Sequence, residues 1–140
     1  MAFTTVPRAV QIGRVGEFLA QAIFEDNSYK TARVNHEGFD LLVFDDTGDA
    51  IRVEIKASSR SHGKSYKFAT ATGSKAKRLL SADDTDIVVM VAIDLRRIVV
   101  RHVSEIVHKR TTVPESSFLD DESEGTQIRK AIAKVRELKK

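Results

Sequence analysis

The chain has 140 residues, of which 41% are hydrophobic and 31% charged, a balance typical of one globular domain covering residues 1–140. It has no cysteine, which excludes disulfides and thiolate chemistry, and its longest apolar run, residues 87–93, is too short to cross a bilayer. Because residues 1–10 lack a signal-peptide pattern, we expect a soluble cytoplasmic protein without a membrane partner, and the net charge of +3 mildly favours a polyanionic one.

The first predicted element is a helix over residues 9–25, where apolar residues recur at helical spacing. Gly13 and Gly16 lie one turn apart inside it. Glycine weakens a helix, so this pair indicates a close approach of the helix backbone to another element. A short strand is predicted next, at residues 30–35.

The central feature is a predicted antiparallel hairpin. One strand covers residues 39–45, and a turn around Gly48 leads into the second strand at residues 50–57. Apolar and polar residues alternate strictly along residues 50–57, so we expect one face to be buried and the other to be open to solvent.

The second half of the chain shows further strands and a closing helix. Strands are predicted at residues 66–70, 85–94 and 97–103, the second of them a β-branched run typical of burial on both faces. The patterns between them predict a short basic helix or turn at 74–81, a helical turn at 104–108, an irregular acidic stretch at 113–125 and a basic helix at about 126–138. This order predicts an α/β fold with a central mixed sheet flanked by helices.

Two carboxylates and a lysine are brought together by the predicted hairpin. Glu54 and Lys56 point to the same side of one strand, roughly 7 Å apart along it, and Asp40 begins the other strand. Such a group suits Mg²⁺, which prefers oxygen ligands and usually takes only one or two protein carboxylates. A bound metal can acidify a water and stabilise charge on a phosphodiester, and a neighbouring lysine can orient that water. Each fragment alone is more often a turn residue or a surface ion pair, so their combination carries the hypothesis.

Three motifs make the chain resemble a known family. They are "IGRVGE" at 12–17, "GFDLLVF" at 38–44 and "VEIKAS" at 53–58. With them the chain resembles the PD-(D/E)XK nuclease superfamily over about residues 9–107. It is most similar to two small branches, the intron-encoded homing endonucleases and the Holliday junction resolvases. Phenylalanine replaces the usual proline before the motif aspartate.

The resemblance implies a restriction-endonuclease-like core and a set of site residues. Asp40, Glu54 and the carbonyl of Ile55 would bind the metal, and Lys56 would be the catalytic lysine. Glu17, on the first helix, would hold a metal-bound water or a second metal; without the family it would be taken for a solvent-facing residue. The implied cofactor is Mg²⁺, and we expect Mn²⁺ to support activity as well.

A basic segment follows the hairpin. Between residues 60 and 78 the chain has six Lys or Arg, one His and no acid. This is either a solvated loop or a surface that contacts nucleic-acid phosphates. The candidate nucleic-acid contacts are Arg60, Lys64, Lys67, Lys75, Lys77 and Arg78.

These features favour a metal-dependent endodeoxyribonuclease with DNA as its partner. The alternatives are a non-catalytic nucleic-acid-binding module on the same fold, and an interaction protein in which Glu54 and Lys56 form only a surface ion pair. The DNA substrate is either a junction met in recombination or a specific duplex site. The scarcity of elements beyond the core leans slightly toward structure-selective recognition, whereas the local likeness leans slightly toward the homing branch, so both substrates stay open. With one site per chain, cutting both strands is most simply done by a homodimer or higher homo-oligomer, with the strand pair at 87–103 and the C-terminal helix as candidate interfaces.

Overall fold

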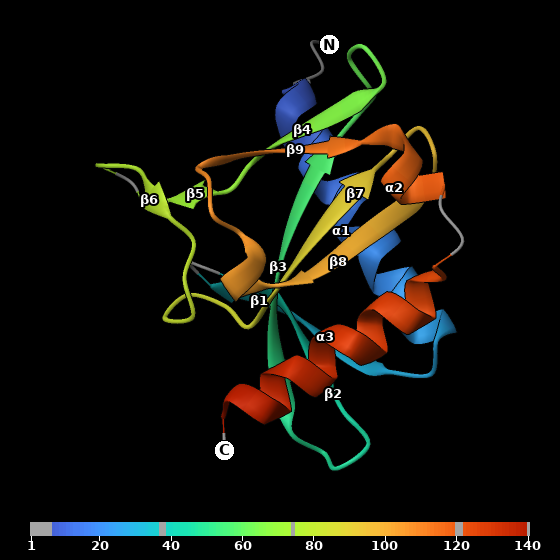
Figure 1. Cartoon of the computed structure of the whole chain (residues 1–140), viewed down its shortest axis with the longest axis vertical. Coiled ribbons are helices and arrows are strands. Elements are labelled where there is room, and N and C mark those ends of the chain that lie inside the picture. Colours follow the sequence, from blue (N-terminus) through green and yellow to red (C-terminus); the bar gives the residue numbers. More distant parts are fainter. Residues whose placement is uncertain (1–6, 37–38, 74, 120–121, 140) are drawn as a thin grey trace, which may run out of the picture.

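The protein is described by a computed structural model in which residues 7–36, 39–73, 75–119 and 122–139 are placed. A twisted five-stranded sheet forms its centre, in the order β1-β2-β3-β7-β8 (Figure 1). The strands are β1 (Lys30–His36), β2 (Phe39–Phe44), β3 (Ala50–Ser58), β7 (Ile87–Ala92) and β8 (Arg97–His102). Neighbouring strands are antiparallel except β3 and β7, which are parallel. The predicted α/β fold with a mixed sheet and the predicted hairpin are therefore confirmed.

Two long helices cover one face of this sheet. They are α1 (Arg8–Asp26) and α3 (Glu124–Leu138), which begins after the N-cap Ser123. Their buried side chains pack with alternate residues of β2, β3, β7 and β8 in one apolar core. In the described ranges, no helix combines the length and apolar character needed to cross a membrane.

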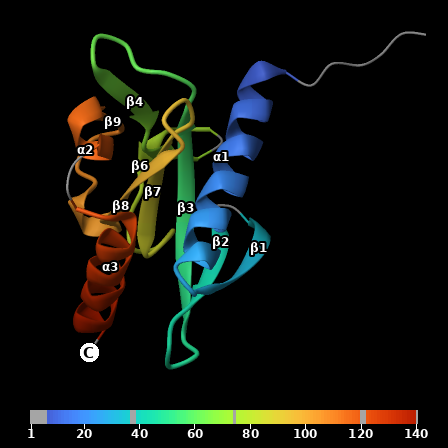
Figure 2. The same ribbon diagram turned by 90° about the vertical axis from the view of Figure 1, so that its right-hand side faces the viewer.

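A second layer covers the other face. It is built from β4 (Ser65–Ala69), β9 (Arg110–Pro114) and the short helix α2 (Glu115–Leu119), which form a second apolar core with β7 and β8. Figure 2 shows this layer and helix α1 on opposite sides of β3. The expectation that one face of β3 is open to solvent is therefore wrong at Glu54, which is buried. The covering layer comes from distant sequence, so alternation within β3 could not reveal it.

Three local expectations also need correction. The stretch 113–125 is not irregular, since it contains the end of β9, helix α2 and the start of α3. Residues 74–81 hold no helix in their described part; β6 (Arg78–Leu79) pairs instead with β5 (Ala71–Thr72), while Ser74 lies outside the described residues. The predicted helical turn at 104–108 is the shorter 3-10 helix η1 (Val103–Glu105).

The proposed interface on residues 87–103 and the C-terminal helix is not supported. Every residue of β7 is buried, and the apolar stripe of α3 packs against the sheet. These apolar residues are already used inside one chain, so they offer no free surface for a second copy.

Close packing fixes helix α1 over β3. A Cβ atom at Gly16 would lie 2.5 Å from the Cβ of Ala57, so only glycine allows this approach. The expected close approach is thus confirmed at Gly16, whereas a Cβ at Gly13 would meet nothing within 4 Å. Since Ala57 adjoins Lys56 in β3, this contact sets the next helical residue, Glu17, beside the predicted site.

Candidate active site

The site lies where strands β2 and β3 separate. Their pairing runs from Phe44–Ala50 to Leu41–Val53. Beyond Val53, β3 continues beside β7 as far as Ser58. Asp40 and Glu54 are the first residues past the end of the β2–β3 ladder, so their side chains meet at the fork.

Asp40 closes this fork with its carboxylate. Its Oδ2 accepts a hydrogen bond of 2.8 Å from the backbone N–H of Ile55. In an extended strand the N–H and C=O of one residue point to the same side. The carbonyl of Ile55 therefore also points toward the fork, and two carboxylates and one carbonyl oxygen face a common region.

Glu54 is the most strongly perturbed carboxyl group of the site. Burial raises its pKa to about 9, with further upward contributions from the charge of Asp40 and a hydrogen bond to Asp40, and Glu17 adds to them. The ammonium of Lys56 acts in the opposite direction but does not compensate. At neutral pH and without a cation, Glu54 therefore holds a proton and donates a hydrogen bond to Asp40.

Lys56 lies beside this pair. Its Nζ is 3.7 Å from Oε1 of Glu54, and a quarter of its side chain is exposed. Both residues project from the same side of β3 because strand side chains alternate. The ammonium is thus next to the carboxylates and still reached by solvent or by a bound substrate.

Helix α1 adds a third carboxylate. The pKa of Glu17 is raised by burial and by the charge of Asp40, while Arg33 and Arg14 oppose the shift. Nη2 of Arg33 lies 3.7 Å from Oε1 of Glu17, and its guanidinium stands 4.4 Å above the ring centre of Phe18. Glu17 is therefore part of the cluster and is not a solvent-facing helical residue.

Arg33, Arg14 and Phe18 were not identified from the sequence. Phe18 is 55% exposed, which is unusual for a large aromatic side chain, and the cation–π contact with Arg33 accounts for it in part. The contact joins a helix to a strand, so no local spacing signals it. The local indication in the sequence is that Phe18 falls outside the apolar stripe of the predicted helix.

The residues at the fork fit a hard divalent cation. The charge of Asp40 raises the pKa of Glu54, so the two carboxylates repel when both are ionised, and a bound cation relieves that repulsion. In the described part of the chain, no group of three or more His, Cys, Asp or Glu side chains is placed to hold a metal ion, so Glu17 does not complete such a group with Asp40 and Glu54. Two carboxylates with a backbone carbonyl suit Mg²⁺, which keeps several waters and takes few protein ligands.

The basic segment lies in the second layer and its connections. Its six predicted nucleic-acid contacts are all exposed, as phosphate contacts must be. Arg78 differs from the others because its guanidinium donates two hydrogen bonds, of 2.8 and 2.7 Å, to Asp84. This pairing neutralises much of its charge and makes Arg78 the weakest candidate of the six.

Comparisons with known proteins bear on the fold. No protein-family model matches the chain, and no curated protein matches it. Among solved structures it is similar to the bacterial homing endonuclease I-Ssp6803I, with a TM-score of 0.73 at 14% sequence identity. The match covers 96% of this chain and 99% of that one. The chain therefore shares the fold of that homing endonuclease, and the expected restriction-endonuclease-like fold is confirmed.

Proposed function

We propose that the protein is a Mg²⁺-dependent DNA endonuclease that hydrolyses phosphodiester bonds. The observation that carries this proposal is the meeting of Asp40, Glu54 and Lys56 at the fork between β2 and β3. A buried carboxyl group whose pKa is strongly raised beside a second carboxylate is typical of functional sites. The fold shared with a homing endonuclease supports the same conclusion.

Each residue has a role in this reaction. Asp40, Glu54 and the Ile55 carbonyl would hold the cation, which supplies positive charge near the phosphate and lowers the pKa of a bound water. Lys56 donates hydrogen bonds that orient the attacking water and offsets charge on the phosphate. Glu17 accepts hydrogen bonds from water at the edge of the site, while Arg33 keeps the Glu17 carboxylate in place.

The site itself does not specify the form of DNA. The fold shared with a homing endonuclease favours cleavage at a chosen sequence in duplex DNA, and a four-way junction is the competing substrate. The deciding experiment offers a long duplex, a single strand, a flap and a four-way junction to the purified protein. Mg²⁺ and Mn²⁺ should support cleavage and EDTA should stop it. A single cut in long duplex selects the homing-like activity, preference for the junction selects the resolvase-like activity, and no cleavage of any substrate contradicts the proposal.

A non-catalytic DNA-binding module is the alternative, and the exposed basic residues favour it equally. It predicts that DNA binds but stays intact with either metal. It also gives Glu54 no role, because a carboxylate near DNA repels phosphate unless a cation intervenes. Binding and cleavage measured on the same preparation therefore separate the two functions.

Cutting both strands of a duplex requires two sites in one assembly, so we propose a homodimer or a higher homo-oligomer. Since the apolar residues of β7 and the apolar stripe of α3 are buried inside one chain, the interface would use side chains exposed on the surface. Analytical ultracentrifugation, with and without DNA, measures the assembly. A protein that remains a monomer on duplex DNA and still cuts both strands together would contradict this arrangement.

A further inference from the structure

Strands β4 and β9 form a two-stranded antiparallel ribbon outside the central sheet. Five residue pairs connect them, from Ser65 opposite Pro114 to Ala69 opposite Arg110. Backbone hydrogen bonds of 2.8 Å continue the pairing at both ends, from Glu115 to Lys64 and from Thr70 to Lys109. Figure 1 shows the ribbon lying across one end of β3, the strand that carries Glu54 and Lys56.

The inner face of the ribbon is firmly anchored. Tyr66, Phe68 and Val113 are buried in the second core, and the rings of Tyr66 and Phe118 meet edge to face with centres 5.0 Å apart. The hydroxyl of Tyr66 donates a hydrogen bond of 2.6 Å to Asp94. The ribbon is therefore a rigid element, which positions side chains more accurately than a loop does.

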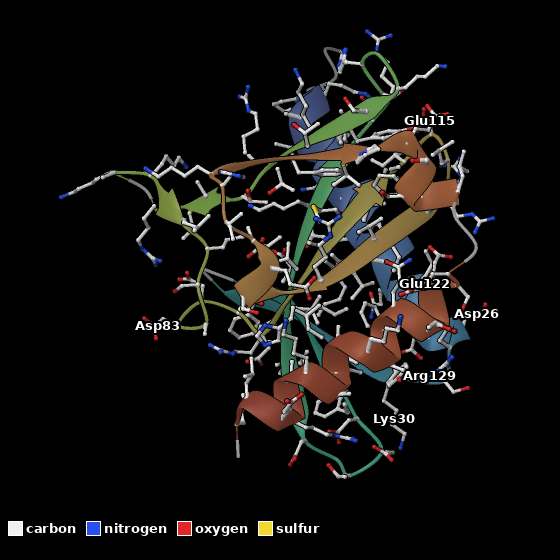
Figure 3. The ribbon with its side chains drawn as sticks, viewed as in Figure 1. Asp26, Lys30, Asp83, Glu115, Glu122 and Arg129 are labelled. Atoms are coloured by element: carbon white, nitrogen blue, oxygen red, sulfur yellow. The ribbon has the colours of Figure 1, made fainter. Side chains whose placement is uncertain are left out.

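The outer face carries polar and basic side chains. Strand alternation places Lys67 opposite Thr112 and Ala69 opposite Arg110, and all four residues are exposed. The strands have no Asp or Glu in this face; Glu115, at the start of α2, lies beyond the end of the ribbon (Figure 3). This face thus offers two cations and a hydroxyl around the small side chain of Ala69.

The size and chemistry of this face fit the major groove of duplex DNA. That groove is about 12 Å wide and admits a two-stranded ribbon. A five-residue strand is roughly 17 Å long, about the length of five base pairs. Arginine and lysine donate to O6 and N7 of guanine, and threonine can contact the methyl group of thymine or a base-edge polar atom.

We propose that the outer face of the β4–β9 ribbon enters the major groove and that Lys67, Arg110 and Thr112 read base edges there. This inference rests on the proposed function, because it takes duplex DNA as the ligand. It gives Lys67 a role in sequence choice in place of the phosphate contact expected from the basic segment. It also supplies base-reading residues that the sequence did not reveal, since Arg110 and Thr112 lie far along the chain from Lys67.

The test is selection of bound duplexes from a random library by the full-length protein in EDTA, where no cleavage occurs. The wild type should select a preferred block of about five contiguous base pairs for each protomer that is bound to the duplex. Lys67→Ala and Arg110→Ala should each relax the preference at one position of that block by about 10- to 100-fold. Arg97→Ala, at an exposed arginine of β8 outside the ribbon, is the matched control and should leave the preference unchanged. Melting temperatures equal to that of the wild type show that the variants are folded.

A second measurement identifies the groove. Methylation of guanine N7 lies in the major groove, so it should block binding of the wild type at the selected guanines, and Arg110→Ala or Lys67→Ala should remove that interference. Selection of no sequence by the wild type, or a preference unchanged in both variants, would overturn base reading by the ribbon. These outcomes are independent of cleavage: a protein that cuts DNA in Mg²⁺ but shows unchanged preferences keeps the proposed function and loses this inference. A protein that never cuts DNA, yet loses sequence preference in the variants, keeps the ribbon and loses the nuclease.

Discussion

Two buried carboxyl groups, those of Asp45 and Glu54, lie nine residues apart in the chain, on either side of the β2–β3 turn. Their pKa values are shifted in opposite directions. Asp45 is 7% exposed and Glu54 8%. Burial alone would raise the pKa of Asp45, but hydrogen bonds from Thr47, Arg136 and the Asp49 N–H outweigh it and lower the pKa to about 2. Burial raises the pKa of Glu54 to about 9, and the neighbouring carboxyl groups of Asp40 and Glu17 add to the shift more than Lys56 opposes it.

The comparison shows that the depth of burial and the partners of a buried charge together distinguish these two sites. Asp45 ties the β2–β3 turn to α3 through Arg136, whose Nε donates a hydrogen bond of 3.0 Å to Oδ2. Its charge is fully compensated within the chain. The charge of Glu54 is not, so its environment is suited to a ligand that the chain does not contain.

The largest effect is expected on the rate of DNA cleavage, and it tests the functional role of Glu54. Glu54→Gln removes a metal ligand and Lys56→Ala removes the group that orients water, so each should lower the cleavage rate by about 10³-fold or more. DNA affinity, measured by fluorescence anisotropy, should persist. The surface ion pair of Lys130 and Glu122 is the control, and Lys130→Ala should cleave at the wild-type rate. Unchanged cleavage by Lys56→Ala would remove it from the site.

Asp45→Asn tests the structural role of the buried Asp45 carboxylate. The amide cannot accept the same hydrogen bonds as the carboxylate and leaves Arg136 without its partner, so the free energy of unfolding should fall by about 1–3 kcal/mol. Because the pKa of Asp45 is lowered on folding, its stabilisation is present above about pH 4 and is lost as the pH falls toward 2. Chemical denaturation at pH 7 and pH 3 should therefore show a deficit in the variant that shrinks in acid.

Asp46→Asn is the control, because Asp46 also contacts Arg136 but is 84% exposed on its side chain. It should change stability by well under 1 kcal/mol. Wild-type cleavage by Asp45→Asn after correction for stability is expected. A specific loss of cleavage would contradict the division between the two carboxylates.

A stability effect of opposite sign is expected at the fork. The pKa of Glu54 is raised on folding, so the folded state keeps a proton that the unfolded chain has lost, and stability declines as the pH rises from about 4.5 to about 9. Glu54→Gln removes this cost and should stabilise the metal-free protein at pH 8 by about 1–3 kcal/mol. Thermal melting in EDTA at pH 5 and pH 8 measures it, with little difference expected at pH 5. Destabilisation of the variant at pH 8 would mean that Glu54 is compensated like Asp45.

The smallest effect is expected at the edge of the cluster. Arg33→Ala removes the cation beside Glu17 and the partner of the Phe18 ring. Support of this kind affects activity by about tenfold, and Arg33→Lys should restore part of the charge but not the planar contact with the ring. Cleavage rates measured over a range of pH should show the alanine variant shifted to higher pH, because an unpaired Glu17 holds its proton longer. A profile identical to the wild type would separate Arg33 from the site.

Local patterns predicted much of the frame on which this site stands. The alternation of residues 50–57 identified the β2–β3 hairpin and placed Glu54 and Lys56 on one side of a strand. The β-branched run correctly indicated that β7 is buried throughout. Gly16 signalled the close approach that carries Glu17 to the fork. Each of these signals is contained in a few consecutive residues.

The rest depends on contacts between distant residues. The burial of Glu54, and with it the raised pKa, comes from a layer that includes Phe118 of α2. The pairing of Arg78 with Asp84 and of Lys67 with Thr112 likewise requires the folded chain. The sequence "TTVP" before Glu115 combines β-branched residues with a proline at the end of a strand. This pattern is a local signal for strand β9 and for the start of α2, in the stretch that we expected to be irregular.

The central claim is that the fork holds a divalent cation in exchange for the proton on Glu54. Isothermal titration of the metal-free protein with Mn²⁺, repeated at pH 7 in two buffers of different ionisation enthalpy, measures binding and proton release together. We predict one Mn²⁺ site per chain, and about one proton released when Mn²⁺ binds. The affinity for Mn²⁺ should rise with pH toward 9 and should be lost in Glu54→Gln. Mn²⁺ binding that releases no proton and is unchanged in Glu54→Gln would contradict it.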